Sequence, residues 1–200
     1  MLNRRQLALS VLATVSLASC AALEPVPVNG RAKALVDAAR AQGRHFVFYD
    51  GGYTRIAYPG GDVAPGRGAC TDVIIRAYRT ALRVDLQKLV HEDMSANFAQ
   101  YPHLWALTAP DENIDHRRVP NLSRFFERVG ASLPLSHNAN DYRPGDIIAM
   151  NPSHIAFVSD RRVRGRTDHL VIIQNNGFGV REDVQDFVSR PLTGHFRYAL

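Results

Sequence analysis

Hydrophobic positions follow a helical period in the first two thirds of the chain and a strand period in the last third. Residues 31–42 are rich in alanine and stop at Gly43, a pattern that predicts a helix with a glycine cap. A second helical pattern opens at Cys70 and runs through residues 72–79. A third follows Pro120 and ends at Gly130. We therefore expect three helices, with Cys70 at the start of the middle one.

The last third contains short apolar and β-branched runs separated by turn residues. These runs predict strands at 146–150, 154–159, 170–174 and 195–198. Residues 46–49 form another short apolar piece, whereas residues 91–118 are mostly polar and are expected to be irregular. One helix that delivers Cys70 onto an antiparallel sheet is an α+β arrangement.

The N-terminus has the pattern of an export signal. Arg4 and Arg5 precede an apolar stretch, and Leu17-Ala18-Ser19-Cys20 resembles a bacterial lipobox, in which the cysteine is lipidated. We expect residues 1–19 to be a lipoprotein signal peptide, 20–29 a lipid-anchored extended tether, and 30–200 a single domain. The predicted location is the cell envelope, facing the periplasm of a Gram-negative bacterium. The alternative is an ordinary secretory signal with an incidental cysteine.

Net charge argues against a nucleic-acid partner. The formal charge is +5, and removal of residues 1–19 leaves 22 basic and 19 acidic side chains, or +3. The basic residues are scattered except in residues 161–166, which have the pattern of a solvated hairpin tip. The expected membrane contact is therefore made through the lipid on Cys20.

Cys70 is the first candidate for chemistry. The small residues 65–69 lead into the predicted helix, whose N-terminus favours an anion, so we expect an accessible thiolate of low pKa. With Cys20 lipidated, Cys70 has no partner within the chain for a disulfide. His154, at the start of a predicted strand, suggests a cysteine–histidine nucleophile. The alternative is a buried, inert thiol.

The strand pattern also suggests a third member of this site. If residues 154–159 and 170–175 form a hairpin, His154 lies opposite the end that carries Gln174 and Asn175. Gln174 shares a face with the alternate residues Leu170 and Ile172, whereas Asn175 points the other way. Gln174 is therefore the preferred residue to orient the imidazole, with Asn175 as the alternative.

These motifs resemble the NlpC-type cell-wall cysteine peptidases. The resemblance covers residues 46–198 and rests on Tyr58-Pro59-Gly60-Gly61 before Cys70, on Pro144-Gly145-Asp146, and on the strand that begins at His154. It implies a papain-like fold with a helix that carries the nucleophile packed on a central antiparallel sheet. It further implies hydrolysis of peptidoglycan peptides without a cofactor, and a Tyr58 hydroxyl near Cys70 that stabilises the oxyanion. The alternative for Tyr58 is packing on the glycine turn.

A closer resemblance is to a poorly characterised family of exported bacterial proteins in the same clan. It is carried by Gly61-Asp62, Cys70-Thr71-Asp72, Asp85-Leu86-Gln87, His91-Glu92-Asp93-Met94, residues 114–118 and residues 194–198. Two features depart from the simple enzymes. The usual Asp-Cys-Ser-Gly is replaced by residues 68–71, and the segment between Cys70 and His154 is longer. The pocket is therefore expected to differ from that for a standard stem peptide.

The long insertion holds further polar candidates. His91, His116 and Arg117 are candidates for the substrate groove, and the histidine and carboxylate spacing fits no standard zinc pattern, so no metal is expected. Arg117 and Arg118 suit either a peptide carboxylate or structural ion pairs. The favoured function is a lipid-anchored cysteine hydrolase of peptidoglycan amide bonds. A non-catalytic murein-binding module and a thioester acyltransferase or transpeptidase remain open.

Overall fold

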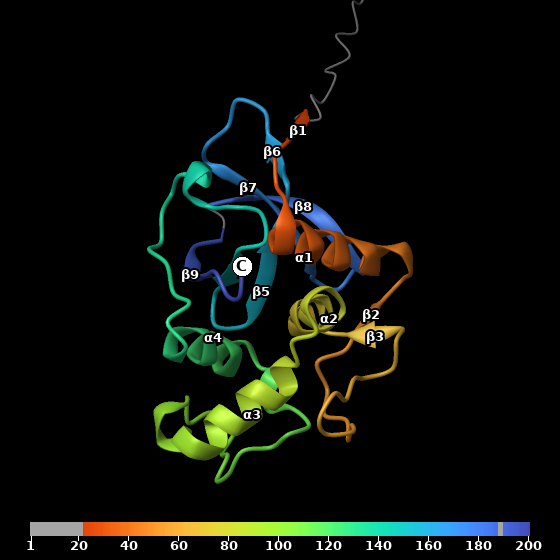
Figure 1. Cartoon of the computed structure of the whole chain (residues 1–200), viewed down its shortest axis with the longest axis vertical. Coiled ribbons are helices and arrows are strands. Elements are labelled where there is room, and N and C mark those ends of the chain that lie inside the picture. Colours follow the sequence, from red (N-terminus) through yellow and green to blue (C-terminus); the bar gives the residue numbers. More distant parts are fainter. Residues whose placement is uncertain (1–21, 188–189) are drawn as a thin grey trace, which may run out of the picture.

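The computed structural model describes residues 22–187 and 190–200, with four α-helices and a main antiparallel sheet in this part of the chain (Figure 1). The helices are α1 (Gly30–Ala41), α2 (Cys70–Leu82), α3 (Leu86–Asn97) and α4 (Val119–Arg128), and short 3-10 turns lie at Gln42–Arg44, Phe98–Gln100, Asp115–Arg117 and Ala139–Asp141. The strands are β1 (Leu23–Pro25), β2 (Phe48–Tyr49), β3 (Arg67–Gly68), β4 (Ile147–Met150), β5 (His154–Val158), β6 (Arg161–Val163), β7 (His169–Asn175), β8 (Val180–Asp186) and β9 (Leu192–Phe196). The expected α+β class is confirmed.

The main sheet has the strand order β8-β7-β5-β4-β9, and every neighbouring pair is antiparallel. Its two faces form separate apolar clusters because successive side chains along a strand point to opposite sides. Ile155 and Phe157 of β5 face the helices, whereas Ala156 and Val158 belong to the cluster on the other face. In Figure 1, α1 (orange) and α2 (yellow) lie beside the blue strands, with α3 and α4 below them.

Helix α2 is the central buried element. Its residues from Cys70 to Ile75 are all buried, and Tyr78 further along stacks on Phe157 of β5 with the ring centroids 6.1 Å apart. The Tyr78 hydroxyl donates to the Tyr198 carbonyl oxygen at 2.8 Å, so the buried polar group is satisfied. The prediction that a helix begins at Cys70 and packs on an antiparallel sheet is confirmed.

Two elements were not expected from the sequence. Helix α3 occupies part of the segment predicted to be irregular, and it buries Leu86, Val90 and Met94 at helical spacing behind an Asp85 N-cap. Strand β8 is an edge strand with the polar sequence VREDVQD, which lacks the apolar alternation that predicts a strand.

The expected tether is partly docked on the domain. Residues 23–25 form β1 and pair antiparallel with β6, at residues 161–163 of the expected hairpin tip. The expected signal peptide and the expected lipidation residue, Cys20, lie outside the described residues. Within the described part, no helix has the length and apolar character needed to cross a membrane.

Candidate functional site

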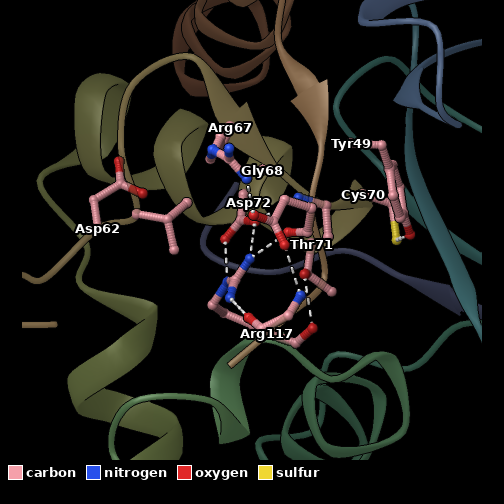
Figure 2. Close-up of polar contacts among 12 residues, drawn as sticks. Tyr49, Asp62, Arg67, Gly68, Cys70, Thr71, Asp72 and Arg117 are labelled. Atoms are coloured by element: carbon pink, nitrogen blue, oxygen red, sulfur yellow. Dashed lines mark hydrogen bonds and ion pairs between the residues drawn. The ribbon is translucent and has the colours of Figure 1, made fainter. Parts of the chain in front are cut away.

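Cys70 lies at the floor of a groove of about 360 Å³ that Tyr49, Trp105 and Ser153 also line. Its sulfur is 3.9 Å from the Tyr49 hydroxyl, which is positioned to donate to it, and 3.9 Å from the Ser153 carbonyl oxygen, which can accept the thiol proton. Figure 2 shows the Tyr49 ring beside the Cys70 sulfur. The sequence brings them together because β2 pairs in parallel with β3, setting Tyr49 opposite Gly68, two residues before Cys70.

The thiol is buried, contrary to the expectation of an accessible thiolate. Only 2% of Cys70 is exposed, and this burial raises its pKa, because desolvation outweighs the hydrogen bonds from the Ile155 and Thr71 amides and from Tyr49. A helix N-terminus alone does not lower the pKa of a thiol that is this deeply buried. The low-pKa prediction is therefore wrong, and the resting group is a neutral thiol.

We predict that Cys70 is alkylated slowly at neutral pH. In a Cys20→Ala background Cys70 is the only cysteine of the chain, so iodoacetamide uptake followed by mass spectrometry reports it alone. Because the thiolate is the nucleophile, the rate should rise with pH through a midpoint above roughly 8.5, the value of a free thiol. A midpoint near 6 or 7 contradicts the burial argument.

His154 stands at the start of β5 and contacts the side chain predicted for it. Its Nε2 is 2.5 Å from Oε1 of Gln174, and Gln174 Nε2 in turn donates to Oδ2 of Asp183 at 2.7 Å. The register Phe157 opposite Ile173 puts His154 and Gln174 on the same face of the sheet. Arg181 Nε donates to the Asp183 carboxylate at 2.8 Å, which completes a row of four polar side chains.

This row assigns the imidazole tautomer. A carboxylate accepts hydrogen bonds and cannot donate them, so the amide nitrogen of Gln174 faces Asp183 and its oxygen faces His154. His154 Nε2 must then carry the proton, which leaves Nδ1 as the basic nitrogen. Burial lowers the pKa of His154, with Gln174 opposing it, so the ring is neutral at pH 7 and able to accept a proton.

Asn175 has a different task from Gln174. It is fully buried on the opposite face, where Nδ2 donates to the Gly68 carbonyl oxygen at 3.0 Å and Oδ1 accepts from the Gly177 amide at 3.2 Å. These bonds tie the end of β7 to the segment before Cys70. The geometry therefore supports Gln174, the preferred residue, over Asn175 as the neighbour of His154.

Cys70 and His154 lie close in the fold without a direct bond. The Ser153 carbonyl and the Ile155 amide, one residue on either side of His154, both contact the Cys70 sulfur. Among the described residues, no hydrogen bond joins that sulfur to the imidazole, and His154 does not line the groove. The register places the His154 side chain on the face of the sheet that carries Met150 and Ala156, away from α2, so a catalytic pair requires the imidazole to turn toward Cys70 when substrate binds.

Tyr49 occupies the place expected for Tyr58. Tyr58 packs edge-on against His91, with centroids 5.0 Å apart, and is absent from the described lining of the Cys70 groove. Burial and the neighbouring Cys70 raise the pKa of Tyr49 to about 12, so its hydroxyl stays protonated and can donate. The alternative weighed for Tyr58, packing, is the one the structure supports. The apolar run 46–49 signalled a strand, but only its parallel pairing with β3 reveals that Tyr49 reaches Cys70.

Arg117 is a structural residue beneath the site (Figure 2). Its Nε and Nη2 donate to the two carboxylate oxygens of Asp72, each at 2.9 Å, and further bonds reach the carbonyl oxygens of Gly52 and Asp50. Asp72 also accepts from the Ala69 amide at 2.6 Å, at the start of α2. Arg117 therefore links the segment after β2 to the helix that carries Cys70. Arg117 lines the Cys70 groove, as expected, but four of its five N–H donors bind within the protein, so its main contacts are structural.

The histidines expected in the groove lie elsewhere. His91 packs on Tyr58, and His116 is buried, where desolvation lowers its pKa to about 3 and keeps it neutral. Neither is among the described residues that line the Cys70 groove. Across residues 22–187 and 190–200, no group of three or more His, Cys, Asp or Glu side chains is arranged to hold a metal ion.

Comparison with known proteins places these features in a family. The chain is 48% identical over 169 residues to "Uncharacterized protein YijF" of Escherichia coli (strain K12), covering 82% of this chain and 80% of that protein. Among solved structures, NlpC2 from Trichomonas vaginalis matches 86% of this chain at 17% identity and a TM-score of 0.42, and this chain spans about half of it, 48%. Residues 36–198 match the family described as "Domain of unknown function (DUF1287)", and the chain belongs to that family.

Proposed function

We propose that this protein is a cysteine hydrolase that cleaves amide bonds of peptidoglycan peptides. The observation that carries the proposal is the position of Cys70 at the start of α2, where its sulfur contacts the backbone next to the first residue of β5. That first residue is His154, which is held by Gln174, and Gln174 is held in turn by Asp183. A thiol, a neutral imidazole of fixed tautomer and a protonated tyrosine are the parts needed for thioester chemistry. We infer the papain-like arrangement from this helix and strand.

The proposed reaction balances with these groups alone. Nδ1 of His154 takes the Cys70 proton as the sulfur attacks the carbonyl carbon, and the Tyr49 hydroxyl with the Cys70 backbone amide stabilises the oxyanion. The C–N bond breaks as the imidazolium gives its proton to the leaving amine, which leaves a thioester. Water then attacks, Nδ1 takes its proton, and release of the acid returns the proton to sulfur.

The substrate class rests on three supports. The N-terminal sequence resembles a lipoprotein export signal, which would bring the domain to the cell wall. The motifs around Cys70 and His154 resemble those of cell-wall peptidases. The groove is open and lined by exposed aromatic rings, 58% exposed for Tyr53 and 50% for Trp105, which suit an extended polymer with sugar and peptide parts.

Intact sacculi and purified muropeptides test the function. The mature protein should release products whose mass corresponds to addition of one water across one amide bond, and Cys70→Ala should release none. Products joined to an added amine would instead identify acyl transfer from the same thioester. Binding to sacculi without any new product, by a folded protein, would favour the murein-binding alternative and exclude the hydrolase.

The proposed location has its own test at Cys20. We expect Cys20→Ala to move the protein from the membrane fraction to the soluble fraction of the envelope, because a lipid on that residue would be its anchor. Fractionation with immunodetection measures this shift. Unchanged membrane partitioning would exclude Cys20 as the anchoring residue.

A further inference from the structure

Arg117 and Arg118 are neighbours in sequence but differ in what their side chains contact. Both line the Cys70 groove, but Arg117 uses four of its five N–H donors on Asp72 and two backbone carbonyls. Arg118 lines the Cys70 groove, and its one side-chain hydrogen bond among the described residues runs from Nη1 to Oδ1 of Asp115 at a long 3.4 Å. A guanidinium has five N–H donors, so most of those of Arg118 have no partner in the described protein.

Trp105 holds the Arg118 guanidinium in place. The guanidinium carbon lies 4.2 Å from the centroid of the indole ring, close enough for a cation–π contact. Trp105 and Ala106 both adopt left-handed backbone conformations, with φ of 60° and 51°, which cost energy in residues other than glycine. This strained segment places the indole against Arg118 at the wall of the groove.

The groove lacks a negative charge that would neutralise Arg118 from within. None of the described residues that line it is aspartate or glutamate, and Asp115, only 1% exposed, lies behind it and also accepts from the Asp111 amide. Arg118 immediately precedes α4, whose first turn contains no acidic residue, so the positive end of that helix adds to the same potential. An anionic substrate group is the complement of this wall.

We propose that Arg118, held by Trp105, binds a carboxylate of the substrate, so that the groove selects acidic peptides over their amidated forms. Arginine suits this contact because its planar fork matches both oxygens of a carboxylate. The inference names the substrate class of the proposed Cys70 hydrolase and therefore rests on that function. Its test measures binding of peptides and does not require turnover.

Trp105 provides the readout, because it is the only tryptophan of the chain and lies against Arg118. The experiment titrates the Cys70→Ala protein with a synthetic stem peptide that carries a free glutamate α-carboxylate, and with the same peptide as its α-carboxamide. Tryptophan fluorescence gives the two dissociation constants. We expect the acid to bind about 10- to 100-fold more tightly, the range for a charge-assisted hydrogen-bonded pair.

Further substitutions in the Cys70→Ala protein show whether Arg118 causes the preference for the acid peptide. Arg118→Ala should bind both peptides equally, and Arg118→Lys should keep part of the preference, since lysine keeps the charge and loses the fork. Arg124→Ala is the matched control, because Arg124 is an exposed arginine of α4 paired with Glu127 and does not line the groove. It should keep the full preference. Circular dichroism checks that each variant is folded.

The outcomes separate this inference from the proposed function. Equal binding of the two peptides, no binding of either, or a preference that survives in folded Arg118→Ala would each overturn the role of Arg118. A preference that depends on Arg118, in a protein whose wild type hydrolyses neither peptide, would support the carboxylate site and count against the hydrolase. A preference with hydrolysis of the acid supports both.

Discussion

Cys70→Ala is expected to lower kcat/KM for muropeptide hydrolysis on the order of 10⁴-fold or more, because it removes the atom that forms the thioester. His154→Ala should have a comparable effect, since His154 is the proposed base and the backbone on either side of it contacts the Cys70 sulfur. The measurement is initial rate against substrate concentration on one muropeptide. Residual hydrolysis within tenfold of wild type would exclude Cys70 as the nucleophile.

Gln174→Ala should act more mildly than these two. Gln174 fixes the tautomer and orientation of His154 but carries no charge, so its loss should reduce kcat/KM by roughly 10- to 100-fold, or about 1.4 to 2.7 kcal/mol. The effect should fall on kcat more than on KM, because Gln174 does not line the groove.

Asn175→Ala is the matched comparison for Gln174→Ala, since the two residues are adjacent on β7 and face opposite ways. Its loss removes one of two bonds to the Gly68 carbonyl, which still accepts from the Asp50 amide at 3.2 Å, so it should cost about 0.5 to 1.5 kcal/mol of unfolding free energy. Its kcat should fall less than that of Gln174→Ala. If folded Asn175→Ala loses more activity than folded Gln174→Ala, Gln174 is not the orienting residue.

The sequence carries enough information for the core of this site. The helix at Cys70 was predictable because small residues precede a continuous helical pattern, and the contact of Gln174 with His154 followed from the two-residue period of a strand. Both patterns are visible within a single helix or strand, so they can be recognised without knowledge of tertiary contacts. The general α+β class follows from the same two periods.

Local periodicity does not predict which distant segments of the chain pair with each other. Tyr49 reaches Cys70 through a parallel β2–β3 pair, and Asp183 reaches Gln174 from a polar edge strand, so neither has a local signal. Burial of the thiol also depends on packing from β2 and β5, which is why a helix-start argument gave the wrong direction for its pKa. The motif at Tyr58 suggested that this tyrosine lies near Cys70, but Tyr58 packs against His91 in another part of the fold.

Arg117→Met is expected to lower the unfolding free energy by about 3 to 5 kcal/mol. It leaves the Asp72 carboxylate without its cation in a place where the two side chains are only 2% and 4% exposed. Four donor contacts to Asp72, Gly52 and Asp50 are lost together, and these hold the segment after β2 to the start of α2. Denaturant unfolding followed by circular dichroism measures the loss.

Two further variants test whether the buried charge is the cause. Arg124→Met breaks an exposed pair with Glu127, at 44% and 47% exposure, and should cost at most about 1 kcal/mol. The double variant Asp72→Asn with Arg117→Met removes both buried charges while keeping an oxygen for the Ala69 amide, so it should cost less than the sum of the two single changes. If Arg117→Met destabilises the protein no more than Arg124→Met does, the buried ion pair with Asp72 does not hold the start of α2 in place. The structural role assigned to Arg117 would then be wrong.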